Sequence, residues 1–73
     1  MDMNDVMMCA REEFRRASSK YGAFHNYHEG YAVLKEEVDE LWDEIKGNQD
    51  KDKLTKEAAH VIAMGMRFLF DLL

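Results

Sequence analysis

The chain has 73 residues, of which 47% are hydrophobic and 34% are charged, with no proline and one cysteine. This composition predicts one small globular domain over residues 1–73 and excludes an intrachain disulfide, which would need a second cysteine. The net charge of −5 disfavours nucleic acid and anionic membranes as partners, and without a membrane-length apolar run or a basic leader we expect a cytoplasmic protein.

The first predicted helix lies within residues 3–21. Apolar side chains recur there at alternating intervals of four and three residues, which places them on one helical face: Met3, Met7, Ala10, Phe14, Ala17 and Tyr21. Gly22 follows directly, and glycine most easily takes the left-handed conformation that ends many helices. We therefore expect this helix to stop at Gly22 and a connection to follow.

The second predicted helix begins near Tyr27 and ends near Lys46. Asn26 and Glu29 are spaced as in a capping box, in which the two side chains satisfy free backbone N–H groups at the helix start. Lys46 suits the negative carboxyl end of a helix, and Gly47 suits its cap. One apolar stripe, with Trp42 beside it, runs along this helix: Tyr31, Leu34, Val38, Leu41 and Ile45.

The third predicted helix is capped by Asp50 or Asp52 and runs nearly to Leu73. It carries one apolar face made of Leu54, Ala58, Val61, Gly65, Phe68, Leu69 and Leu72. A second apolar face lies opposite and is made of Ala59, Ile62, Ala63, Met66, Phe70 and Leu73.

Two other helices of a chain this short can cover only one of these faces well. The second face therefore predicts a homo-oligomer, a dimer or a dimer of dimers, unless the first helix wraps around it. The predicted fold is all-α: an amino-terminal helix and an antiparallel helical hairpin that associate into an oligomeric helical bundle.

Six carboxylates fall between residues 36 and 46 of the second helix. On a helical wheel, Glu37 and Glu40 lie on the shoulder of the apolar stripe, where an antiparallel third helix would present Glu57 and His60. Clustered carboxylates repel one another unless a cation lies among them, and hard oxygen ligands suit Mg²⁺ or Mn²⁺. The alternative is an ordinary solvated acidic surface.

The order E-x-x-E, a gap, and E-x-x-D on the next helix resembles the signature of the MazG-like, all-α nucleoside triphosphate pyrophosphohydrolases. Glu37 and Glu40 form the first pair, and Glu57 begins the second, with His60 in the aspartate position. The flanking segments "HEGYAVLKEEVDELWDEIK" and "EAAHVIAMGMRFLFDL" are similar to those of short phage and bacterial members. The resemblance covers roughly residues 21–73.

This resemblance implies magnesium-dependent hydrolysis of a nucleoside triphosphate to the monophosphate and pyrophosphate by an oligomeric helical protein. It implies that a glutamate, Glu37 or Glu40, orients or deprotonates the attacking water. Lys53 is a candidate phosphate contact, and Trp42 is a candidate for stacking on the base, although its spacing also suits a core position. The implied metal ligands are Glu37, Glu40, Glu57 and His60.

His60 departs from the family pattern, because imidazole is a poor ligand for Mg²⁺ but a good one for Mn²⁺ and softer metals. Three interpretations stay open: His60 binds such a metal, three glutamates suffice without it, or the chain is a degenerate, non-catalytic oligomeric helical module. A fourth follows from the Glu-x-x-His spacing, which is also the ligand pattern of di-iron carboxylate bundles.

Overall fold

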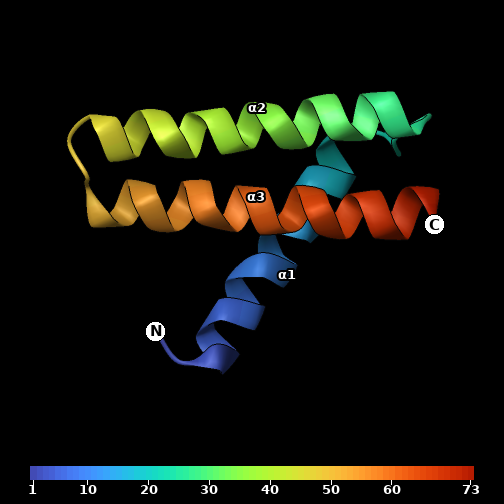
Figure 1. Cartoon of the computed structure of the whole chain (residues 1–73). Helices are drawn as coiled ribbons and strands as arrows, with labels where there is room; N and C mark the ends of the chain where they lie inside the picture. Colours follow the sequence, from blue (N-terminus) through green and yellow to red (C-terminus); the bar gives the residue numbers. More distant parts are fainter.

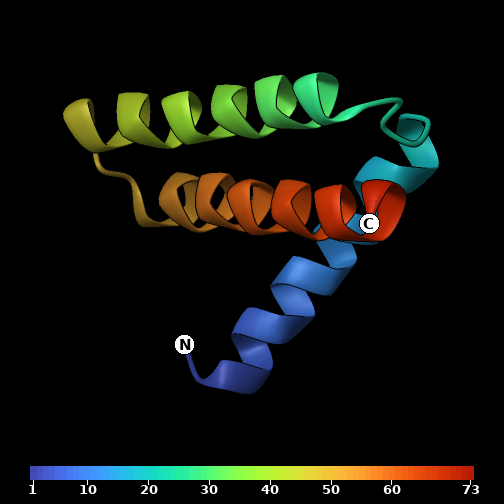
Figure 2. The same cartoon turned by 45° about the vertical axis from the view of Figure 1, so that its right-hand side comes forward.

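The computed structural model describes residues 1–73 and contains three α-helices and no strand. The helices are α1 (Met3–Lys20), α2 (Tyr27–Lys46) and α3 (Lys51–Leu72). α3 lies between the other two: α2 packs along one side of it, and α1 crosses its other side obliquely (Figures 1 and 2). The predicted all-α class with three helices is confirmed. None of the helices combines the length and apolar character needed to cross a bilayer.

Side-chain caps begin α2 and α3 where the sequence predicted them. The Asn26 side chain accepts a hydrogen bond from the Glu29 N–H at 2.8 Å, and Asp50 caps α3 by accepting from the Lys53 N–H at 3.0 Å. The reciprocal half of the predicted capping box is displaced by one residue, because the Glu29 carboxylate accepts from the backbone N–H of His25 at 3.0 Å.

The prediction of a left-handed stop at Gly22 is wrong. α1 ends at Lys20 and its cap, Tyr21, has extended backbone (φ −114°, ψ 144°), while no glycine of the chain has a positive φ. Gly47 caps α2 as predicted. The one residue with a positive φ is Gln49, at 54°, in the loop that joins α2 to α3.

α2 and α3 are in close contact at Gly30. A Cβ atom there would lie 2.7 Å from Cδ2 of Phe68 and 3.0 Å from Cδ1 of Leu72, so a glycine permits this contact. The start of α2 thus packs against the end of α3, and the chain runs along α2 to the loop 47–50 and returns along α3 (Figure 1). This arrangement places the middle of α2, with its glutamates, opposite the middle of α3.

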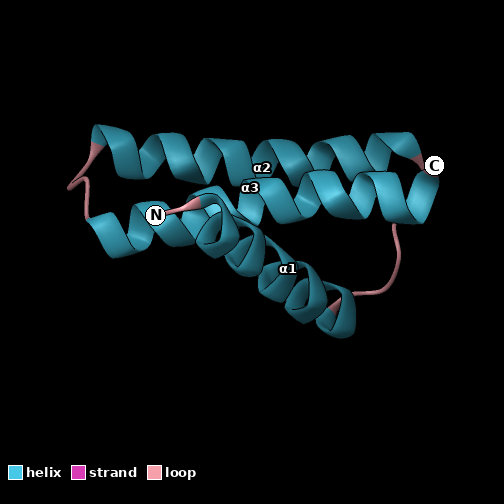
Figure 3. Cartoon of the chain, turned by 90° about the horizontal axis from the view of Figure 1, so that it is seen from below, coloured by secondary structure: helices cyan, strands magenta, loops and turns pink.

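α1 packs on α3 through small side chains. Ala10 and Ala17 of α1 and Ala59 and Ala63 of α3 are all buried, and small residues let two helix axes come close together. α1 crosses α3 diagonally in the view of Figure 3, so it covers only part of the second apolar face. Other members of that face stay exposed: Ile62, Phe70 and Leu73.

The connection between α1 and α2 is held against α3 by Arg67, a buried residue that is 2% exposed. Its guanidinium donates to the carbonyl oxygen of Gly22 at 2.7 Å and lies 4.3 Å from the ring centroid of Phe24. One turn further along α3, Asp71 accepts from the Phe24 N–H at 3.0 Å. These contacts fix the connection as one wall of a cavity between the helices.

Candidate metal centre

Four potential metal ligands converge between α2 and α3. Glu37 and Glu40 of α2 and Glu57 and His60 of α3 each offer one ligand atom, and these atoms lie within 4.8 Å of one another. The i,i+3 spacing within each helix puts both members of a pair on one face, and the packing of α2 on α3 turns the two faces toward each other. The structure therefore brings together the four residues that the sequence proposed as ligands.

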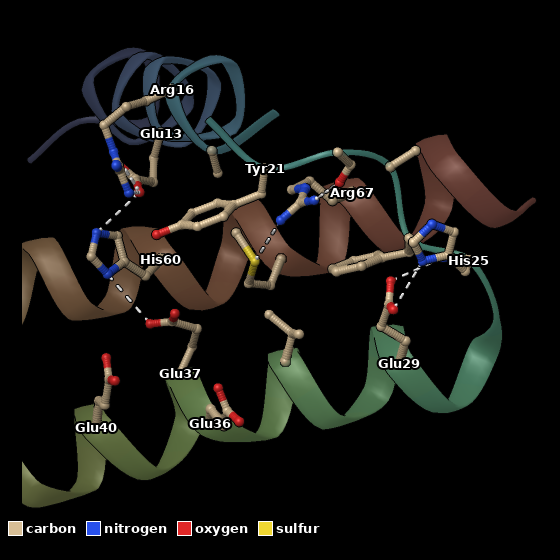
Figure 4. A pocket seen from close by; sticks show the side chains of 16 residues that line it. Glu13, Arg16, Tyr21, His25, Glu29, Glu36, Glu37, Glu40, His60 and Arg67 are labelled. Atoms are coloured by element: carbon tan, nitrogen blue, oxygen red, sulfur yellow. Dashed lines mark hydrogen bonds and ion pairs between the residues drawn. The ribbon is translucent and has the colours of Figure 1, made fainter. Parts of the chain in front are cut away.

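Within this cluster, His60 lies between Glu37 of α2 and Glu13 of α1 (Figure 4). Its Nδ1 atom is 3.4 Å from Oε2 of Glu37 and 3.7 Å from Oε2 of Glu57, while Nε2 is 3.1 Å from Oε1 of Glu13 on α1. These are ion-pair distances without the alignment of hydrogen bonds, because Nε2 and both Oε2 atoms are buried with no hydrogen-bond partner. Such atoms keep unused capacity to bind a cation or to form a better-aligned bond.

The electrostatics of the cluster are those of carboxylates crowded together. Burial raises the pKa of the Glu37 carboxyl above its usual value, and the nearby Glu40 carboxylate raises it further, against the opposing effect of His60. Burial also raises the pKa of Glu57, again opposed by His60. The ionised forms of both residues are thus disfavoured, and a bound cation would relieve this.

A cavity of 510 Å³ adjoins the cluster, bounded by all three helices and by the connection between α1 and α2. Its volume is in the range of small-molecule sites. Its wall holds two arginines, Arg16 and Arg67, against five glutamates: Glu13, Glu29, Glu36, Glu37 and Glu40 (Figure 4). A phosphate-bearing ligand would therefore be repelled from this cavity unless a cation accompanied it.

Trp42 and Lys53 do not line this cavity. The Trp42 side chain is 54% exposed and lies under the ammonium group of Lys46, which is 5.6 Å from its ring centroid. Lys53 is exposed in the first turn of α3. Their assignment to substrate binding stays a prediction.

Sequence reasoning missed the contribution of α1. Glu13 reaches His60, and Arg16 holds Glu13 through hydrogen bonds from Nε to Oε1 and Oε2 at 3.1 and 2.9 Å. This pairing with Arg16 is the main reason that the pKa of Glu13 is lowered. The only signal in the sequence is the i,i+3 spacing of Glu13 and Arg16, which predicts a local ion pair but no approach to α3.

No protein-family model, curated protein or solved structure matches this chain. The resemblance to the MazG-like pyrophosphohydrolases thus rests on the residues of α2 and α3 described above and stays a hypothesis.

Proposed function

We propose that this protein is a divalent-cation-dependent pyrophosphohydrolase that converts a nucleoside triphosphate and water to the monophosphate and pyrophosphate. The observation that carries the proposal is the convergence of Glu37, Glu40, Glu57 and His60 beside a 510 Å³ cavity. The resemblance of these residues and their flanking segments to the MazG-like family supports the same reaction.

The donor set fits a divalent cation. Buried oxygen atoms of Glu37 and Glu57 have no hydrogen-bond partner, and three carboxylates supply the hard ligands that Mg²⁺ and Mn²⁺ prefer. The imidazole of His60 favours Mn²⁺ over Mg²⁺. A bound cation would neutralise charge on the phosphate oxygens and lower the pKa of a coordinated water.

The protein's own side chains have distinct roles in this proposal. Glu37 and Glu40 both belong to the cluster and line the cavity, so either carboxylate can orient a water molecule and accept its proton. The water oxygen then bonds to the α-phosphorus as the bond from that atom to the bridging oxygen breaks, and pyrophosphate leaves. Arg16, whose side chain is 51% exposed at the cavity wall, is placed to contact a phosphate.

The working unit in this proposal is a homo-oligomer, a dimer or a dimer of dimers, built from the antiparallel α2–α3 hairpin. Only eight of the 73 residues are buried, and large apolar side chains on α2 and α3 and at the cap of α3 stay exposed, including Trp42, Leu69, Phe70 and Leu73. A second copy of the chain would cover such surface. Light scattering during gel filtration tests this, and a strict monomer at micromolar concentration would contradict it.

A second candidate function is a non-catalytic helical module of the same fold. The observation that favours it is the position of His60, whose ring nitrogens lie 3.1–3.7 Å from the carboxylates of Glu13, Glu37 and Glu57. A protonated imidazole there would balance part of the negative charge without any metal ion.

Release of pyrophosphate from a panel of nucleoside triphosphates, with Mg²⁺, with Mn²⁺ and with chelator, separates these candidates. We expect wild-type activity that needs the cation and is higher with Mn²⁺, loss of activity in Glu37→Gln, and normal activity in Asp43→Asn, a matched change on the exposed face of α2. If only His60→Asp is active, the non-catalytic module is correct. If neither protein is active, the hydrolase proposal is wrong, and iron in a coloured preparation would indicate a di-iron bundle.

A further inference from the structure

The contact between Glu13 and His60 connects α1 to the candidate metal centre. The two side chains are largely buried, each 14% exposed, and Oε1 of Glu13 lies 3.1 Å from Nε2 of His60. The two nitrogens of an imidazole point away from each other. Glu13 therefore lies on the opposite side of the ring from Glu37 and Glu57, which face Nδ1, and it is placed to act on His60 rather than to bind the same cation.

This geometry gives the two nitrogens of His60 different neighbours, with Nδ1 facing the cluster and Nε2 facing α1. A neutral imidazole carries one N–H and one lone pair, and the partner of the N–H selects the tautomer. Both nitrogens face carboxylates, but when a cation among the glutamates takes the lone pair of Nδ1, the N–H of the neutral ring is on Nε2, and the Glu13 carboxylate 3.1 Å away is the acceptor that it faces. Histidines that bind metals are usually oriented by a carboxylate or carbonyl on the second nitrogen in this way.

We propose that Glu13 is a positioning residue that holds His60 with Nε2–H toward α1 and Nδ1 toward the cation, and thereby makes the centre prefer Mn²⁺ to Mg²⁺. This inference rests on the metal centre of the proposed function. It gives α1, which lies outside the family resemblance, a specific role in that centre.

Arg16 supports this role of Glu13. Its guanidinium holds both carboxylate oxygens of Glu13 from within the same helix, so the carboxylate keeps its charge and its direction. The buried alanines between α1 and α3 fix the distance between Glu13 and His60. The result is a chain of charged contacts from Arg16 through Glu13 and His60 to the glutamates of the cluster.

Calorimetric titration of metal-free protein with Mn²⁺ and with Mg²⁺ tests the proposal without relying on activity. Glu13→Gln keeps the shape of the side chain but removes its charge, and loss of such an orienting partner typically weakens metal binding about 10–100-fold. We expect a loss in this range for Mn²⁺ and a smaller loss for Mg²⁺. Glu12→Gln, the same charge change at the neighbouring exposed residue, should bind Mn²⁺ as wild type does. Circular dichroism verifies that each variant is folded.

A double-mutant cycle shows whether Glu13 acts through the imidazole. In a His60→Asp background there is no ring to orient, so Glu13→Gln should no longer weaken Mn²⁺ binding. Equal losses in the two backgrounds, or unchanged Mn²⁺ binding by Glu13→Gln alone, would overturn the positioning role while leaving the metal centre intact. Failure of the wild-type protein to bind Mn²⁺ would instead overturn the centre itself, and the inference with it.

Discussion

Replacing Glu37 by glutamine should change the stability of this protein in opposite directions with and without a divalent cation. Glu37 lies within 4.8 Å of the other ligand atoms, and the pKa of its carboxyl is raised, first by burial and then by the charge of Glu40. A raised carboxyl pKa in the folded state means that ionisation of Glu37 at neutral pH costs stability. Glutamine keeps the size and polarity of the side chain and removes that charge.

The magnitude follows from the distances. Two unit charges 4.8 Å apart repel by about 3.5 kcal/mol at an effective dielectric constant of ~20. Attraction to His60 at 3.4 Å and solvent around the exposed Glu40 offset most of this. We therefore expect Glu37→Gln to stabilise the metal-free protein by about 1 kcal/mol, which raises the melting temperature of a domain this size by ~4–8 °C.

With Mn²⁺ present, the order of the two melting temperatures should reverse, and wild type should melt above Glu37→Gln. A ligand present at about 100 times its dissociation constant stabilises the folded state by ~2.7 kcal/mol, or roughly 10–20 °C in melting temperature. Glu37→Gln removes one ligand and one negative charge from the centre, so it should gain far less from the same Mn²⁺ concentration. The variant would then melt above wild type in chelator and below it in Mn²⁺.

Thermal melts followed by circular dichroism, at one protein concentration, measure both effects. Asp43→Asn is the control, because it makes the same charge change on the exposed face of α2 and should respond to Mn²⁺ as wild type does. A Glu37→Gln variant that melts below wild type in chelator would refute the repulsion argument. An undiminished Mn²⁺ shift in that variant would refute Glu37 as a ligand.

Three further predictions concern packing and pH. Gly30→Ala should destabilise the fold by about 1–3 kcal/mol despite alanine's higher helix propensity, because the new Cβ would lie 2.7 Å from Phe68; a urea midpoint at or above that of wild type would contradict this. Arg67→Met should cost about 1.5–3 kcal/mol through the lost charged hydrogen bond and speed proteolysis within residues 21–26, and unchanged cleavage would show that Arg67 does not hold this connection. The pKa of Glu37 in the folded state is raised above 4.5, so the fold favours the protonated carboxyl. This favourable contribution to stability is present at low pH and is lost as the pH rises and Glu37 ionises. The metal-free advantage of Glu37→Gln should therefore shrink as pH falls toward 4.5, and the Mn²⁺ shift of wild type should shrink with it; melts from pH 7 to 4.5 in which both stay constant would disprove the assignment.

The sequence was sufficient for features that depend on neighbours within about one helical turn. The caps at Asn26 and Asp50 join residues three apart, and the pairing of Glu37 with Glu40 on one face follows from 3.6 residues per turn. The short connection between α2 and α3 then made it possible to predict that these glutamates meet Glu57 and His60. Helical periodicity and chain connectivity led to that arrangement as one of two interpretations, beside a solvated acidic surface, and the family resemblance favoured it.

The tertiary structure alone decided what α1 does. The approach of Glu13 to His60 joins residues 47 positions apart in the sequence, and it depends on the angle at which buried alanines let α1 cross α3. Gly22 likewise has no left-handed conformation, and its carbonyl accepts a hydrogen bond from Arg67, 45 residues away, which no local pattern predicts. Periodicity shows which face of a helix is apolar, but the angle between two helices depends on how both surfaces fit together. That fit is a property of the packed chain, and in this protein it brings a residue of α1 against the histidine of the candidate metal centre.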